Sequence, residues 1–151
     1  MKVADYVVNY LAELGVKHAF VVYGSAIGDV VDAFTRTDRI RHVCVMHEQA
    51  GAFAAEVLTK VTGIIGVVIV TSGPGGTNLL TGVANCWYDS VPALYITGQV
   101  STAYQRPDPA VRQLAFQEND IVSMVKPITI YAAMLRDAKE IKLVLDLGVY
   151  E

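Results

Sequence analysis

The chain has 151 residues, of which 53% are hydrophobic and 18% are charged, and its formal charge at pH 7 is −3. This composition excludes an intrinsically disordered chain, because such chains are poor in apolar residues and rich in charge. The slight acidity and the lack of a Lys/Arg cluster argue against nucleic acid as a partner. The length fits one domain. A charged fraction below the ~25% of typical globular domains indicates an additional buried surface, such as a subunit interface.

The pattern of apolar residues predicts helices and strands that alternate along the chain. Helices are expected over 3–14, 27–34, 46–61, 78–88, 120–124 and from 137 onward, and strands over 17–22, 40–45, 64–70, 93–97 and 128–131. The strand at 64–70 is continuously apolar, which is typical of a parallel strand covered on both faces. The order predicts an α/β three-layer sandwich, with helices on both faces of a mostly parallel sheet. The last helix is still running at residue 151, so we expect the sheet to lack its last strand.

The sequence predicts no membrane segment and no signal peptide. The longest stretch without Asp, Glu, Lys or Arg is 61–88, and a Gly-rich turn at 72–78 interrupts it, whereas a spanning helix needs ~20 mostly apolar residues. The N-terminus has no apolar core of the kind that signal peptides carry. Cys44 and Cys86 lie in apolar contexts without metal-ligand spacing, and we interpret them as reduced core residues of a cytoplasmic protein.

A Gly-rich turn, VTSGPGGTN at 70–78, stands between the buried strand and the next helix. Ligands of open α/β sheets bind at the carboxyl ends of strands, and glycines allow a ligand to approach the backbone closely. The turn is neither a dinucleotide fingerprint, because position 78 is Asn where a third Gly would stand, nor a P-loop, because no Gly-Lys-Ser/Thr follows. On spacing alone, a purely structural turn is equally compatible with these residues.

Two further groups of polar residues stand at helix starts. His47-Glu48-Gln49 precedes an Ala-rich helix, where Glu48 is either an electrostatic cap or a functional carboxyl against which another element packs closely. His47 is better explained as a hydrogen-bonded partner than as a catalyst. Phe116-Gln117-Glu118 leaves a long loop over 98–117, and loops of that length are usually functional. Gln117 can donate to and accept from a ligand, although a helix-start pair explains it equally well.

These residues belong to a series of blocks that resembles a known family. The blocks, in order, are GVKHAF (15–20), HEQA (47–50), AAE (54–56), VTSGPGGTN (70–78), DSVP (89–92), ITGQV (96–100) and FQENDIV (116–122). Each block is modest alone, but together and in order they are specific. They resemble the N-terminal pyrimidine-binding domain of thiamin-diphosphate enzymes of the acetolactate synthase type, over nearly the whole of residues 1–151.

The resemblance implies a role for each matched residue. Glu48 would hydrogen-bond N1′ of the aminopyrimidine ring and so promote removal of the thiazolium C2 proton, and Pro74 and Asn78 would line the pyrimidine pocket. Gln117 would face the reacting carbon, and Gly24, Ser25 and Ala26 would face it from the side of the other subunit. The activity implied is decarboxylation of a 2-keto acid such as pyruvate and transfer of the remaining unit to a second keto acid or to a keto-sugar.

The resemblance also implies partners and missing parts. In this family the catalytic site lies between two subunits, so we expect self-association across the cofactor site. The diphosphate-binding domain of another subunit would hold the cofactor diphosphate through Mg²⁺, and no metal ligand is assigned to this chain. The Gly-Asp-Gly motif of that domain and the family's Gly-Arg-Pro-Gly-Pro strand are both absent from the sequence. We therefore expect a truncated pyrimidine-binding domain that is inactive in isolation.

One departure from the family pattern and two alternatives stay open. Tyr23-Gly24-Ser25 stands where the family usually has Pro-Gly-Gly or Pro-Gly-Ala, which leaves the specificity for the acceptor undetermined. The first alternative is a natural small subunit of a split thiamin-diphosphate decarboxylase. The second is a non-catalytic relative that dimerises, although the joint presence of Glu48, Pro74, Asn78 and Gln117 argues against loss of function.

Overall fold

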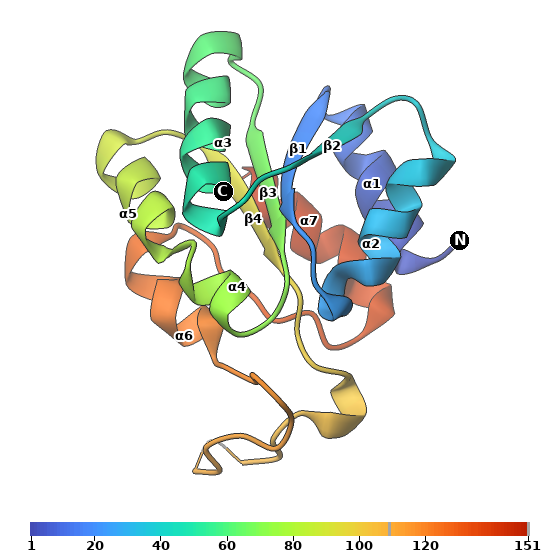
Figure 1. The fold of residues 1–151 in the computed structure, drawn as a ribbon, viewed down its shortest axis with the longest axis vertical. Helices are drawn as coiled ribbons and strands as arrows, with labels where there is room; N and C mark the ends of the chain where they lie inside the picture. The colour runs from blue at the N-terminus through green and yellow to red at the C-terminus, as the bar shows by residue number, and fades with distance from the viewer. Residues whose placement is uncertain (109, 151) are drawn as a thin grey trace.

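The computed structural model describes residues 1–108 and 110–150 and contains one sheet surrounded by helices (Figure 1). The strands are β1 (His18–Val22), β2 (Arg41–Cys44), β3 (Gly66–Val70) and β4 (Ala93–Thr97). The α-helices are α1 (Val3–Glu13), α2 (Gly28–Ala33), α3 (Glu48–Thr62), α4 (Pro74–Thr77), α5 (Leu80–Asp89), α6 (Ile121–Val125) and α7 (Ile141–Tyr150). Short 3-10 helices are η1 (Ser25–Ile27), η2 (Phe34–Arg36), η3 (Thr102–Tyr104), η4 (Lys126–Ile128) and η5 (Ala138–Glu140).

The sheet is parallel throughout its described strands, in the order β2-β1-β3-β4. The chain forms β1, adds β2 on one side, and then returns to add β3 on the other side of β1. This reversal makes a topological switch point between β1 and β3, where open α/β sheets bind their ligands. Every residue of β3 is buried, which confirms the prediction of a strand covered on both faces.

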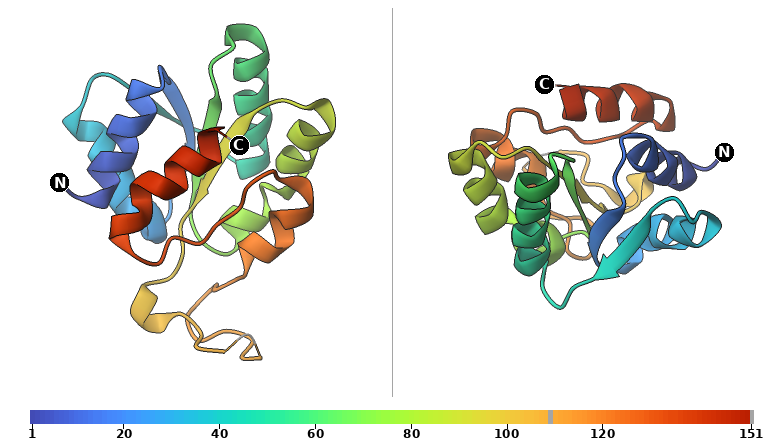
Figure 2. Two further views of the ribbon diagram at one scale, coloured as in Figure 1. Left: turned by 180° about the vertical axis from the view of Figure 1, so that it is seen from behind. Right: turned by 90° about the horizontal axis from the view of Figure 1, so that it is seen from above.

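Two helical layers cover the sheet, as Figure 2 shows. On one face, Val67 and Ile69 of β3 pack in a core built largely from α1, α2 and α7. On the other face, Val68 and Val70 pack with Ala52 and Ala55 of α3 and with residues at the start of α5. The alternation of β3 side chains between two apolar cores confirms the α/β three-layer fold.

Some predicted elements differ from the structure. The helix expected over 27–34 is divided into η1, α2 and η2. The strand expected over 128–131 is wrong, because residues 126–128 form η4 and residues 129–131 take no regular structure. Ile128 packs against the core beside α3 and α5, whereas Ile130 is 74% exposed. These apolar residues therefore belong to a connecting segment. A short apolar run in a sequence is compatible with either a strand or such a segment.

The interpretation of both cysteines as core residues is half wrong. Cys86 is buried in α5, but Cys44 is exposed. Cys44 ends β2, the edge strand of the sheet, in which only His42 is partly buried. An apolar sequence context cannot reveal that a strand lies at an edge. None of the helices in residues 1–108 and 110–150 has the length and apolar character to cross a membrane.

The two thiols are expected to differ in reactivity. Iodoacetamide at neutral pH should alkylate Cys44 in the native protein and leave Cys86 unmodified. Burial raises the pKa of the Cys86 thiol, and the thiolate is the reactive form. Peptide mass mapping measures both sites, and labelling in urea is the control in which both should react. Equal labelling of the two thiols in the native protein would contradict this assignment.

Candidate functional site

The parallel topology places four loops at the carboxyl edge of the sheet. Gly24 to Ala26 follow β1, His47 and Glu48 follow β2, the Gly-rich turn follows β3, and the long loop follows β4. In Figure 1 the start of α3, α4 and the loop after β4 all lie toward this end of the strands. Residues from four distant parts of the sequence therefore meet at one edge, as the predicted sheet requires.

Glu48 is the first residue of α3 and is only 7% exposed. Its Oε2 accepts a hydrogen bond of 2.9 Å from Nδ2 of Asn78. Its Oε1 lies on the side of the Gly-rich turn, 3.7 Å from the position that a Cβ at Gly75 would occupy. The N-terminus of a helix stabilises a carboxylate, so the electrostatic cap and the functional interpretation describe the same residue. One oxygen is paired, and the other faces backbone that carries no side chain.

His47 caps α3 and takes no part in the hydrogen bond between Glu48 and Asn78. Its Nδ1 accepts a hydrogen bond of 3.2 Å from the backbone N–H of Gln49. This geometry satisfies a donor that would otherwise lack a partner in the first turn of the helix. His47 is therefore a hydrogen-bonded partner, as its position in the sequence suggests.

The Gly-rich turn approaches the loop after β1 too closely for side chains. A Cβ at Gly24 would lie 2.4 Å from the side chain of Thr71. Gly73 has a positive φ of 61°, and a Cβ there would lie 2.6 Å from Cβ of Gln117. Glycine avoids both the clash and the cost of the left-handed backbone. The turn is thus packed between Gly24 and Gln117, and Pro74 begins α4 directly after Gly73.

Beside this packed turn lies an open cavity of about 470 Å³ at the switch point between β1 and β3. It is lined by Gly24, Ser25, Ala26, Thr71, Ser72, Gln99, Val100, Ser101, Phe116 and Gln117. Most of the predicted site residues fall into two groups, and Pro74, at the start of α4, belongs to neither. Glu48 and Asn78 are hydrogen-bonded to each other, whereas Gly24, Ser25, Ala26 and Gln117 line the cavity. Tyr23 precedes the cavity residues and is 66% exposed.

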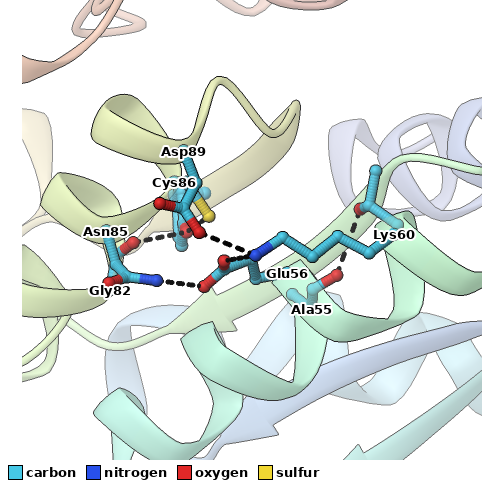
Figure 3. Close-up of polar contacts among 9 residues, drawn as sticks. Ala55, Glu56, Lys60, Gly82, Asn85, Cys86 and Asp89 are labelled. Carbon is cyan, nitrogen blue, oxygen red and sulfur yellow. Dashed lines mark hydrogen bonds and ion pairs between the residues drawn. The ribbon is translucent and has the colours of Figure 1, made fainter.

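A polar cluster that sequence reasoning missed joins α3 to α5 (Figure 3). Glu56 is 3% exposed, and its Oε2 accepts a hydrogen bond of 2.6 Å from Nδ2 of Asn85. Lys60 donates to Oε1 of Glu56 and, at 2.8 Å, to Asp89. The ion pair and hydrogen bond with Lys60 hold the pKa of Asp89 below its usual range. Glu56 and Asp89 lie within the sequence blocks that resemble the family. They are 33 positions apart, so the sequence alone does not indicate that one lysine contacts both.

Glu48 and Glu56 thus repeat one arrangement along α3. They are eight residues apart, a little over two turns of helix, and each accepts a hydrogen bond from an asparagine near or in α5. Glu48 lies at the carboxyl edge of the sheet and Glu56 lies two turns away from it. The Glu56 cluster joins α3 to α5 away from the carboxyl edge of the sheet.

Glu118 is a second residue whose role the sequence did not show. Glu118 is 9% exposed, and its carboxylate accepts hydrogen bonds from the backbone N–H groups of Arg106, Leu114 and Ala115. The bonds from Leu114 and Arg106 hold the pKa of Glu118 below its usual range. Within residues 1–108 and 110–150, no group of three or more His, Cys, Asp or Glu side chains is placed to hold a metal ion.

The arrangement is typical of an α/β domain that binds a ligand at the carboxyl edge of its sheet. Comparison with known proteins identifies the family. Residues 1–124 match the family described as thiamine pyrophosphate enzyme, N-terminal TPP binding domain; thiamine pyrophosphate and thiamin diphosphate are the same compound. The chain therefore belongs to this family of thiamin-diphosphate enzymes, and it matches their N-terminal domain.

Acetolactate synthases are among the proteins that this chain is similar to. Acetolactate synthase isozyme 3 large subunit of Escherichia coli is 40% identical over 142 residues, which cover 94% of this chain and 24% of that protein. Acetolactate synthase 2 of Nicotiana tabacum is 41% identical over 140 residues, covering 93% of this chain and 20% of that protein. The large subunit of Lactococcus lactis is 39% identical over 144 residues, covering 95% and 24%. The chain spans about a quarter of the length of these relatives.

Proposed function

We propose that this chain binds the aminopyrimidine end of thiamin diphosphate and is the pyrimidine-binding part of a 2-keto-acid decarboxylase and carboligase. The observation that carries the proposal is the buried Glu48–Asn78 pair beside the Gly-rich turn. A ring nitrogen needs a carboxyl oxygen that is not already paired. Oε1 of Glu48 lies 3.7 Å from the position that a Cβ at Gly75 would occupy, so glycine at position 75 keeps a side chain away from this oxygen.

The residues present fit this group, and each has a stated role. Glu48 holds or releases a proton at Oε1 toward the ring, and Asn78 fixes the orientation of that carboxyl through Oε2. Pro74 closes the pyrimidine pocket on the side of the Gly-rich turn. Gly24, Ser25 and Ala26 form the wall between this pocket and the cavity. Gln117 presents its carboxamide to the reacting carbonyl. The bound cofactor supplies the electron sink for the decarboxylation, while the protein orients and tunes it.

The Asn78→Ala protein should bind the cofactor up to about tenfold more weakly, because the hydrogen bond that orients the Glu48 carboxyl contributes ~0.5–1.5 kcal/mol and ~1.4 kcal/mol is a factor of ten. Calorimetric titration with thiamin diphosphate and Mg²⁺ measures the change. Asn85→Ala is the matched control, since it removes an asparagine from Glu56 instead of Glu48, and it should leave the affinity unchanged. Equal affinities for Asn78→Ala and the unaltered protein would contradict the assignment of the pocket.

The proposed substrates are pyruvate as donor and either a second 2-keto acid or a keto-sugar as acceptor. The similarity to acetolactate synthases supports the keto acid, and the hydroxyl and carboxamide groups that line the cavity suit either acceptor. Incubating the native protein with labelled pyruvate and each acceptor, followed by product identification, distinguishes them. Failure to release CO₂ from any 2-keto acid would contradict the proposed activity.

The proposed partners follow from the resemblance, in which this domain supplies the pyrimidine side of a site between two subunits. A diphosphate-binding domain of another subunit would hold Mg²⁺ and the diphosphate, so the protein would self-associate across the cofactor. Exposed apolar side chains support such an interface: Phe53, Val57 and Val61 on α3 and Trp87 and Tyr88 on α5. We also propose a cytoplasmic location for the protein, which is consistent with two cysteines that form no disulfide.

The mass of the native polypeptide shows whether the diphosphate-binding domain belongs to the same polypeptide or to a separate chain. A mass several-fold above 16.3 kDa would place the diphosphate-binding domain on the same polypeptide, since each added domain brings ~100–200 residues. A mass of 16.3 kDa would favour the split enzyme, in which a separate chain supplies it.

A further inference from the structure

Gln117 is held in an unusual backbone conformation at the edge of the cavity. Its φ is 57°, one of two positive values among the described residues other than glycine. Left-handed backbone is unfavourable for a residue with a Cβ and persists only where its surroundings fix it. The conformation of Gln117 therefore requires neighbours that hold it.

The segment that contains Gln117 is fixed on both sides. On one side, Cβ of Gln117 lies against Gly73, and Nδ2 of Asn119 donates a hydrogen bond of 3.1 Å to the carbonyl of Gly73. Nε2 of Gln99 in turn donates to the carbonyl of Asn119 at 2.8 Å. These contacts fasten the segment to the Gly-rich turn and to the end of β4.

On the other side, the carboxylate of Glu118 closes the loop that leads to Gln117. Oε1 accepts a hydrogen bond of 2.6 Å from the backbone N–H of Arg106. Oε2 accepts from the N–H groups of Leu114 at 2.8 Å and of Ala115 at 3.4 Å. A single buried carboxylate thus joins the two ends of this loop directly beside Gln117.

We propose that Glu118 is a positioning residue that holds Gln117 in the cavity by closing the loop from Arg106 to Ala115. The inference rests on the proposed function for the role of Gln117, but closure of the loop can be tested without it. Both carboxylate oxygens face backbone donors, so a carboxamide at position 118 would turn an NH₂ group toward an N–H. Glu118→Gln should therefore open the loop, although the size of the side chain is almost unchanged.

Trypsin reports the opening. Arg106 and Lys126 each precede proline, and trypsin does not readily cleave such bonds, so the bond after Arg112 is the susceptible one in this part of the chain. Cleavage of a native protein follows the population of its locally open state. Glu118→Gln should be cut after Arg112 several-fold faster than the unaltered protein, and Glu13→Gln, at an exposed position on α1, should not.

Turnover reports the positioning. In the native protein with cofactor bound, Glu118→Gln should lower kcat by about 10- to 100-fold, the effect of a small misplacement in an active site. The affinity for thiamin diphosphate should stay within twofold, because Glu48 and Asn78 are untouched. In a Gln117→Ala background, Glu118→Gln should have no further effect on kcat, since coupled residues are not additive.

The outcomes separate the two claims. Unchanged cleavage after Arg112, or losses of kcat that add in the double variant, would overturn the role of Glu118. If Glu118→Gln does not fold, Glu118→Asp keeps the charge on a shorter side chain, and the same cycle is measured with it. A protein that binds no thiamin diphosphate would refute the proposed function, whereas the cleavage result would still decide whether Glu118 closes the loop.

Discussion

The Glu48→Gln protein is expected to turn over a 2-keto acid at least about 100-fold more slowly than the unaltered protein, because proton transfer by a positioned carboxyl contributes ~10²–10⁴ in rate. The substitution preserves size, and a carboxamide oxygen can still accept the hydrogen bond from Asn78. Folding and the shape of the pocket should therefore persist, while the carboxyl that could hold or release a proton at this position is lost. Steady-state kinetics of the native protein measures the effect.

Glu56→Gln is the matched control for this substitution. Glu56 lies on the same helix, is also buried, and also accepts from an asparagine, but it lies away from the carboxyl edge. Its loss should lower the melting temperature, because Lys60 and Asp89 lose part of their network, and should change kcat by less than Glu48→Gln. Equal losses of kcat in the two variants would indicate that Glu48 has a structural role only.

The Gly82→Ala protein is expected to be destabilised by about 1–3 kcal/mol, the usual cost of overpacking a well-packed core. A Cβ at Gly82 would lie 2.2 Å from Cβ of Ala52, where α5 contacts α3. The two helices would have to separate, which would disturb the Glu48–Asn78 pair as well. Denaturant unfolding measures the free energy, and cofactor titration measures the effect on the pocket.

Gly148→Ala is the control with the opposite sign. Gly148 also lies within a helix, but a Cβ there would make only ordinary contacts, the nearest at 3.6 Å from Tyr131. Alanine is up to about 1 kcal/mol more favourable than glycine inside a helix, so this variant should be more stable than the unaltered protein. Destabilisation by Gly148→Ala and tolerance of Gly82→Ala would contradict the described packing of α3 on α5.

The sequence predicted the architecture well because each central element carries a strong local signal. The apolar run that became β3 is buried on both faces, and Gly63, at φ 70°, ends α3 as a left-handed cap. The segment over 128–131 failed for the opposite reason. It is short and follows Pro127, so only its tertiary surroundings decide between a strand and a connecting segment.

The site was predictable in part. The blocks around Glu48 and Asn78 stand at loop positions that a parallel sheet brings to one edge, so their meeting could be foreseen. The roles of Glu118 and Glu56 could not. Glu118 accepts from backbone groups of a loop whose path has no local signal. Glu56 meets Asn85 directly, and Asp89 through Lys60, only because α5 packs against α3.

The most direct test of the proposed role of Glu48 is the rate at which the C2 proton of bound thiamin diphosphate exchanges with deuterium, measured by NMR after acid quench. Exchange reports removal of that proton without any substrate step. We expect fast exchange on the native protein with Mg²⁺, and exchange at least about 100-fold slower with Glu48→Gln at saturating cofactor. Equal exchange rates for Glu48→Gln and the unaltered protein would contradict the assignment of Glu48.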